Sequence, residues 1–236
     1  MKILGIDGSG LVASVAVVED DNLIGEYTTG YKKTHSQTLL PMLDALGQMI
    51  ELDLNTIDAI AVAAGPGSFT GLRIASATAK GLGLTLGCPI VSVPTVDALA
   101  YNMWGNSGII CPILDARRGQ VYTGLYCFED DGTFTVIRPQ CAVDFNEIAA
   151  DINKRGESVT FLGDGVPVFE KTIVDTVTVP YRFAPAHLNR QHASSVATLG
   201  MQYYKNGECE PAADHRPEYL RLSQAERERL EKEGKA

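Results

Sequence analysis

The residues best suited to chemistry in this sequence form a glycine-rich turn, Gly65-Pro66-Gly67-Ser68, between an apolar run and a helical pattern. Such a turn at the start of a helix can bind an anion, because its free backbone N–H groups point outward. Two common nucleotide fingerprints do not fit. The phosphate loop needs GxxxxGK[ST], and the dinucleotide motif GxGxxG is one residue shorter than GPGSFTG. Two interpretations stay open: a nucleotide site, or a packing turn that lets helix and strand approach closely.

The residues on either side of this turn predict the elements that position it. Residues 57–64 form a short apolar run, the pattern of a strand buried on both faces in a parallel sheet. After the turn, Ser68 or Thr70 can cap a helix that extends to Leu86. Apolar residues at steps of three and four give this helix a core stripe, made of Leu72, Ala75, Ala79, Leu82 and Leu86.

Composition restricts the class of protein. The chain has 236 residues, of which 45% are hydrophobic and 21% are charged, which is ordinary for a globular protein of one or two lobes. The net charge of −9 argues against an autonomous RNA binder, which needs a basic face. Five cysteines without a CxxC pair indicate isolated thiols in a reducing compartment. No apolar run approaches the roughly 20 residues of a membrane span, and Asp7 interrupts any signal peptide, so we expect a cytoplasmic protein.

The order of predicted elements defines the fold class. Three strands open the chain, and helix, strand, helix, strand and helix follow, at 2–7, 12–19, 23–27, 35–52, 57–64, 69–86, 90–93 and 96–104. In the first helix Thr38 is the favoured cap, since Pro41 then sits in the first turn; Thr95 can cap the last.

The three-strand opening returns in the second half of the chain, with a hairpin turn at Asp131-Gly132. The predicted elements there are strands 109–115, 120–128, 133–138 and 159–162, and helices 145–155, 166–171 and 191–205. This order is typical of a two-lobed α/β protein of the actin-like, sugar-kinase-like fold, with mixed sheets and flanking helices. We predict an N-terminal lobe at 1–105 and a trimmed C-terminal lobe at 106–236, with helix 191–205 returning to the first lobe.

Proteins of that fold bind nucleotide phosphates at turns that carry acids and small hydroxyl residues. Asp7 and Ser9 would occupy the first such turn, Asp115 the second, and Gly163-Asp164 the place of adenosine. One interpretation is therefore a vestigial nucleotide cleft built from these five residues. The alternatives are a tight hairpin turn capped by Asp7 and a solvated turn in which Asp115 pairs with an arginine.

Five segments of the sequence resemble the TsaB family (formerly YeaZ), and together they span nearly the whole chain. They are ILGIDGSGLVASVAVVE at 3–19, HSQTLLPML at 35–43, GPGSFTGLRIASATAKGLG at 65–83, DARRGQVY at 115–122 and PEYLR at 217–221. The family usually has threonine after the first aspartate, where Gly8 stands here, so one hydroxyl of the nucleotide site is missing.

The resemblance implies a non-catalytic subunit without a cofactor. It would work with a TsaD-like catalytic subunit and a TsaE-like ATPase in threonylcarbamoyl transfer to adenosine 37 of tRNA, and it would meet tRNA only within that complex. The related TsaD carries an HxxxH metal pair on a helix. Here Leu39 stands four residues after His35, and His187 and His192 are five apart, so we expect no metal site.

Two enzymatic alternatives remain. One is an ATP-dependent phosphotransferase, for which Asp7, Asp115 and the turn at Gly163 would have to converge on a magnesium nucleotide. The other is a glycoprotease-like peptidase, although the sequence has no HExxH motif and shows no Ser–His–Asp arrangement by itself.

Two helices are expected to carry the partner interface. Methionines widen the apolar stripe of helix 35–52, and methionine side chains adapt to irregular surfaces. Helix 69–86 has a side of small residues that helix propensity does not explain. The predicted contact residues are Leu40, Met42, Met49, Leu72, Ser76, Ala77 and Gly83. Without the partner, the same patch could pair with itself in a homodimer.

The end of the chain carries little apolar pattern. We expect a loop at 206–216 and a charged helix or solvated tail at 223–236, where Glu228–Lys232 and Glu231–Lys235 stand at helical spacing.

Overall fold

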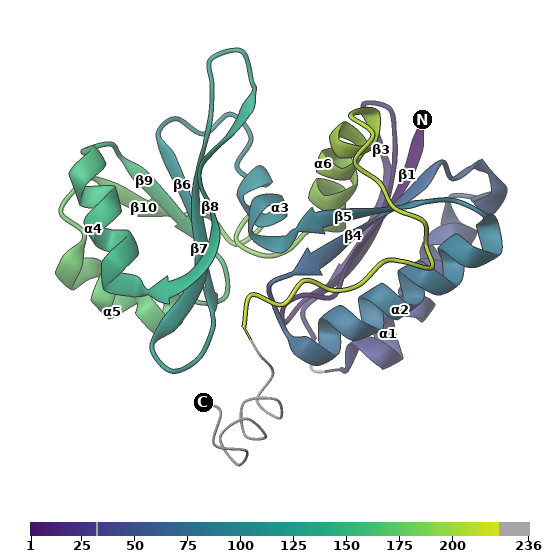
Figure 1. Ribbon diagram of the computed structural model, residues 1–236, viewed down its shortest axis with the longest axis horizontal. Coiled ribbons are helices and arrows are strands. Elements are labelled where there is room, and N and C mark those ends of the chain that lie inside the picture. The colour runs from purple at the N-terminus through teal and green to yellow at the C-terminus, as the bar shows by residue number, and fades with distance from the viewer. Residues whose placement is uncertain (32, 222–236) are drawn as a thin grey trace.

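The computed structural model describes residues 1–31 and 33–221 and shows two lobes side by side (Figure 1). The predicted charged helix at 223–236, with its pairs Glu228–Lys232 and Glu231–Lys235, lies outside the described residues. None of the helices within the described ranges combines the length and apolar composition that crossing a bilayer requires.

The first lobe contains a five-stranded mixed sheet in the order β3-β2-β1-β4-β5. Strands β1, β2 and β3 form an antiparallel meander, and β4 and β5 join it in parallel. Every residue of β4 is buried, as the continuous apolar run predicted. The bounds are β1 Lys2–Asp7, β2 Ala13–Glu19, β3 Asn22–Thr29, β4 Ala59–Gly65 and β5 Ile90–Pro94.

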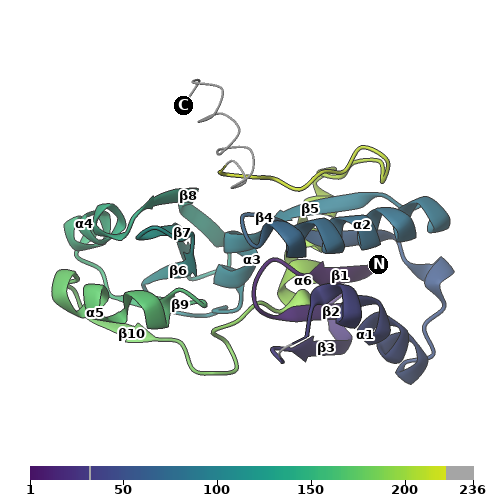
Figure 2. The same ribbon diagram turned by 90° about the horizontal axis from the view of Figure 1, so that it is seen from below.

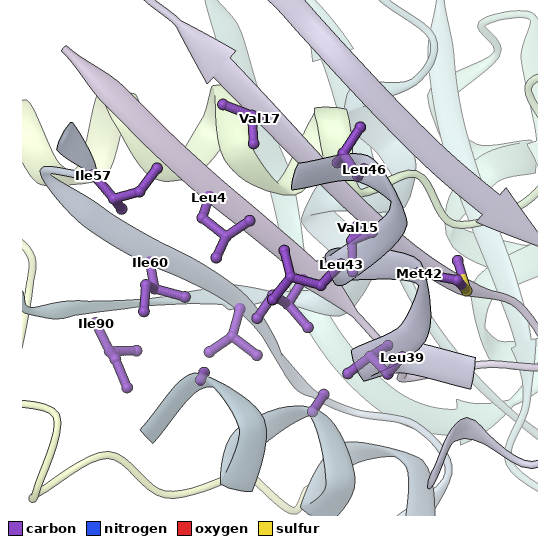
Figure 3. Close-up of a cluster of buried hydrophobic side chains, with 14 of the residues drawn as sticks. Leu4, Val15, Val17, Leu39, Met42, Leu43, Leu46, Ile57, Ile60 and Ile90 are labelled. Carbon is purple, nitrogen blue, oxygen red and sulfur yellow. The ribbon is translucent and has the colours of Figure 1, made fainter. Parts of the chain in front are cut away.

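Helices cover both faces of this sheet. On one face lie α1 (His35–Met49) and α2 (Phe69–Leu86), with the short 3-10 helix η1 (Leu54–Thr56) between them in the chain. On the other face lies α6 (Ala193–Lys205), which returns from the far end of the sequence as predicted (Figure 1). The core under α1 and α2 is made of interdigitating aliphatic side chains (Figure 3), among them Leu4, Val15, Leu39, Leu43, Ile60 and Ile90.

The second lobe repeats the same topology. Its sheet has the order β10-β9-β6-β7-β8, in which β6, β7 and β8 are antiparallel and β9 and β10 are parallel to β6 and β9. Two helices cover its outer face (Figures 1 and 2). The bounds are β6 Ile109–Asp115, β7 Gln120–Phe128, β8 Phe134–Asp144, α4 Phe145–Arg155, β9 Val159–Leu162, α5 Val166–Thr176 and β10 Tyr181–Phe183. Two sheets of matching order confirm the predicted fold class.

A short helix joins the lobes. Helix α3 (Thr95–Tyr101) packs its apolar residues against the inner face of the second sheet, in a cluster that includes Leu99 and Leu162. Asp97 in its first turn accepts a hydrogen bond of 2.7 Å from the hydroxyl of Tyr126 on β7. Burial raises the pKa of Asp97 to about 6. The boundary predicted at residue 105 falls between α3 and β6, and the division into two domains stays a prediction.

Several predicted boundaries were wrong. Helix α1 begins at His35 with Thr34 at the N-cap, not Thr38, so Pro41 lies inside the helix, where its ring is exposed to solvent. Thr95 is the first helical residue of α3 and Pro94 holds the cap position. Strand β8 is longer than predicted, and β10 was missed because three partly exposed residues leave no periodic signal.

Candidate functional site

A cleft of about 610 Å³ lies between the lobes. The turn after β1, the glycine-rich turn after β4, the β6–β7 turn and the end of the described chain all contribute to its wall. The residues that line the cleft include Ser9, Gly10, Phe69, Asp115, Arg117, Arg118, Asp164, Gln191, Tyr219 and Arg221. Three of the five residues predicted for a nucleotide cleft therefore line one cavity, namely Ser9, Asp115 and Asp164.

Asp7 lies behind Ser9 and does not line the cleft. One carboxylate oxygen accepts hydrogen bonds from the backbone N–H and the hydroxyl of Ser9, at 2.8 and 2.6 Å. The other oxygen, Oδ2, is buried and has no partner within the described residues. Burial raises the pKa of Asp7 to about 6. The geometry is that of a turn capped by an aspartate, and whether the cleft binds a nucleotide stays a prediction.

The β6–β7 turn holds its backbone in an unfavourable conformation. Arg117 and Arg118 both have positive φ, 65° and 57°, although neither is a glycine. Asp115 stabilises the turn, because its side chain accepts a 2.7 Å hydrogen bond from the Arg117 N–H and pairs with the Arg117 guanidinium at 3.1 Å. The pairing of Asp115 with an arginine, which the sequence had left open, is therefore present, and a role of Asp115 in a nucleotide cleft stays a prediction.

Polar groups without partners collect at the cleft. Gln191 is 1% exposed and lines the cleft, yet neither polar atom of its amide has a hydrogen-bond partner within the described chain. Burial raises the pKa of Asp164, whose Oδ1 is also unpartnered there. Sequence reasoning missed Gln191, because a glutamine before a helix gives no signal. Gly163 does not line the cleft; its N–H donates to the Asn189 carbonyl at 3.2 Å.

Two of the histidines, His35 and His192, connect neighbouring segments through hydrogen bonds. The Nε2 of His35 lies 2.9 Å from the Gly10 carbonyl, and His192 lies between Glu26 and the carbonyl of His187. No group of three or more possible metal ligands occurs within residues 1–31 and 33–221.

The structure divides the predicted interface residues into two sets. Leu40, Met49 and Ala77 are exposed, the first two at 56% and 78%. Met42, Leu72, Ser76 and Gly83 are buried within the chain, so they are removed from the predicted contact surface. Met42 packs into the core beneath α1 because it shares the inward face with Leu39 and Leu46. The interface itself stays a prediction.

The chain's own C-terminal part covers the small side of α2. Residues 208–221, which we call the C-terminal strap, pair with β5 through two 2.9 Å backbone hydrogen bonds between Ile90 and Glu210. The strap then follows α2 (Figures 1 and 2), where the Lys80 ammonium donates to the carbonyls of Ala213 and His215 at 2.7 and 2.9 Å. A Cβ on Gly83 would lie 2.7 Å from the Cβ of Ala212. The absence of a side chain at Gly83 thus lets the strap approach α2 closely.

The two matching sheets and the cleft between them define a two-lobed protein of the actin-like, sugar-kinase-like class. Within that class, the family model described as "TsaD: tRNA N6-adenosine threonylcarbamoyltransferase" matches residues 22–229. The tRNA threonylcarbamoyladenosine biosynthesis protein TsaB of Bacillus subtilis (strain 168) is 34% identical over 98% of this chain and 99% of its own length. The chain therefore belongs to the TsaB family, within the wider group that the TsaD model describes.

Three further similar proteins agree with this assignment. The TsaB protein of Escherichia coli (strain K12) is 32% identical over 59% of this chain and 64% of its own length. The solved structure of YeaZ from Pseudomonas aeruginosa superposes with a TM-score of 0.79 at 26% identity, covering 93% of this chain and 99% of that one. A similar structure, of TM-score 0.78, is described as having similarity to the peptidase YeaZ.

Proposed function

We propose that this chain is a non-catalytic subunit in the formation of threonylcarbamoyladenosine at position 37 of tRNA. It pairs with a TsaD-like catalytic subunit, and a TsaE-like ATPase joins the pair. The chain contacts tRNA only within that complex, in the cytoplasm. The observation that carries this proposal is the similarity to a TsaB protein over nearly the full length of both chains.

The exposed outer faces of α1 and α2 are the proposed contact surface. Leu40 and Met49 project from α1, and Leu84, 62% exposed, projects from α2 on the same helix as Ala77. The two helices lie side by side on one face of the sheet (Figure 1). Exposed apolar residues on two adjacent helices favour this side of the first lobe as the association site. The small residues Ala77 and Gly81 between them let a partner helix approach closely.

The test replaces exposed apolar residues of this surface by glutamate. Ala77→Glu and Leu84→Glu should each weaken binding to a TsaD-like protein by several kcal/mol, because the charge would be buried unpaired. Val174→Glu, on α5 of the other lobe and similarly exposed at 57%, is the matched control. Binding is measured by calorimetry, and tRNA modification by the reconstituted subunits is measured alongside. Wild-type affinity of both α2 variants would place the interface elsewhere.

The second candidate function is ligand binding in the cleft. Its most specific form is an ATP-dependent phosphotransferase. It is favoured by the unpartnered amide of Gln191 and the unpartnered oxygen of Asp164 at the cleft wall. Calorimetric titration with ATP and magnesium tests it, together with an assay of ATP turnover by the pure chain. Absence of heat and of turnover would reject this function and leave the first proposal intact.

One Ser–His–acid cluster among the described residues bears on the peptidase alternative, and its geometry does not fit. Ser92, His215 and Glu210 form a cluster, but the Ser92 hydroxyl and the Glu210 carboxylate both contact the same nitrogen, Nδ1 of His215, at 3.0 and 2.9 Å. A serine hydrolase needs the serine and the acid on opposite nitrogens of the imidazole. His215 is also only 1% exposed, so a peptide could not reach it.

A further inference from the structure

The C-terminal strap forms a second connection between the two lobes, in addition to α3. Its first part, 208–216, binds only to the first lobe, through β5 and Lys80. Its last part, the PEYLR segment at 217–221, passes the start of α2, and its residues 218–221 form one wall of the cleft. This segment was singled out in the sequence only by resemblance, and its contacts give it a physical role.

Each residue of the PEYLR segment that makes a contact does so at the cleft margin. The Glu218 N–H donates to the Ala64 carbonyl at 2.7 Å, next to the glycine-rich turn. Any side chain on Gly65 would collide with the Glu218 carbonyl, and Gly65 has a φ of 129°. The first glycine of the turn is therefore needed for the strap to approach the end of β4.

Aromatic contacts hold the next residue on the first lobe. The ring of Tyr219 packs on that of Phe69 at the start of α2, with 4.9 Å between centroids. Arg73 donates to the Tyr219 hydroxyl at 3.2 Å while its guanidinium lies 3.9 Å above the centre of the Phe69 ring. Four successive anchors thus bind the strap to the first lobe.

Among the contacts described for residues 208–221, one side-chain hydrogen bond reaches the second lobe. The Nη1 of Arg221 donates to the Ala116 carbonyl at 2.7 Å, at the base of the strained β6–β7 turn. Arg117 and Arg118 line the same cleft, and neither Arg118 nor Arg221 pairs with a carboxylate within the described residues. Among the described residues this one hydrogen bond stands against four anchors on the first lobe, so the bond to Ala116 is the weak end of the strap.

We propose that the PEYLR segment is an interlobe latch. Fixed to the first lobe by its preceding anchors, it closes the cleft when Arg221 binds the Ala116 carbonyl and opens it when that bond breaks. Helix α3 stays packed against the second sheet in both states and acts as the hinge. Access to Gln191 and Asp164 is then controlled by the end of the strap, independently of any partner on α1 and α2.

The test compares two arginine variants of the full-length chain by hydrogen exchange. Arg221→Gln removes the charged donor to Ala116, whereas Arg216→Gln removes an exposed charge from the same strap and serves as the control. A hydrogen bond from a charged group corresponds to roughly a 10- to 100-fold change in an opening equilibrium. Amides at the cleft wall should therefore exchange about tenfold faster or more in Arg221→Gln, notably those of Ser9, Ser68 and Gln120.

Amides of α3 and β4 should exchange at wild-type rates in both variants, because the hinge and the first sheet are unaffected. Equal exchange at the cleft wall in the Arg221 and Arg216 variants would overturn the latch. So would faster exchange spread evenly over α3 and the cleft, since that pattern means general loosening of the lobes.

Discussion

Gly83 distinguishes two explanations for the small residues of α2: that they make room for the C-terminal strap, or that they contact a partner. A Cβ at this position would lie 2.7 Å from the Cβ of Ala212 and 3.1 Å from the Cys88 carbonyl oxygen. Ordinary carbon contacts are about 3.5–4.0 Å, so Gly83→Ala should push the strap outward by about 1 Å. Such overpacking costs about 1–3 kcal/mol, against a gain of about 1 kcal/mol from the helix propensity of alanine.

Gly81 provides the matched control, because it lies two residues away on α2, is exposed, and a Cβ there meets nothing within 4 Å. Gly81→Ala should therefore stabilise the chain by about 1 kcal/mol. The two variants should differ by about 1–3 kcal/mol in the free energy of unfolding, measured by urea titration with circular dichroism. Amides at 208–215 should exchange faster only in Gly83→Ala.

Equal stability of the two variants, with wild-type exchange in the strap, would show that Gly83 is not needed for the strap to pack on α2. If Gly83→Ala instead left the isolated chain unchanged and lowered its affinity for a TsaD-like protein, Gly83 would belong to the partner interface after all. The comparison therefore also decides whether the small side of α2 serves the strap or a partner.

Three further outcomes are expected. Because burial raises the pKa of Asp97 from 3.8 to about 6, the folded state holds that proton more tightly than the unfolded state. The stability contribution is thus present at low pH and lost as pH rises from about 4 to 6. Between pH 5 and 7 the loss is about 1 kcal/mol, and urea titrations of Asp97→Asn should lack it. With a net charge of −9, the lone chain should bind tRNA weakly, and moderate salt should abolish the gel shift; a tight, salt-resistant shift would contradict this. Cys209 is exposed and should react quickly with a thiol reagent. Cys111 is fully buried and has its pKa raised to about 12, so it should react only on unfolding. Equal reaction rates of the two thiols in the native protein would contradict the burial of Cys111.

The fold was predictable because its signals are local. The apolar run before Gly65 and the glycine-rich turn after it predicted β4 and α2, and the second half repeated the opening strands. The cap at Ser68 was also predictable, since its hydroxyl accepts from the Gly71 N–H at 3.3 Å.

The course of the first part of the strap was not predictable, because much of it is held through backbone groups. Lys80 recognises two carbonyls, and Glu210 pairs with Ile90 through main-chain atoms, so neither contact leaves a pattern of side chains. For the same reason the small residues Ser76 and Gly83 were interpreted as facing a partner. A small side on a helix indicates close approach of another backbone, and it does not say whether that backbone belongs to the same chain.

The return of α6 to the first sheet has a consequence for the order of folding. One whole face of that sheet, with Ile3, Ala61 and Val93, is covered by Val196 and Leu199 from near the end of the sequence. During synthesis this face of the first lobe therefore stays uncovered until some hundred residues of the second lobe have emerged. Contacts of such long sequence separation slow folding. A fragment that ends at residue 105 would expose the same face permanently, so it should aggregate instead of folding as an independent lobe.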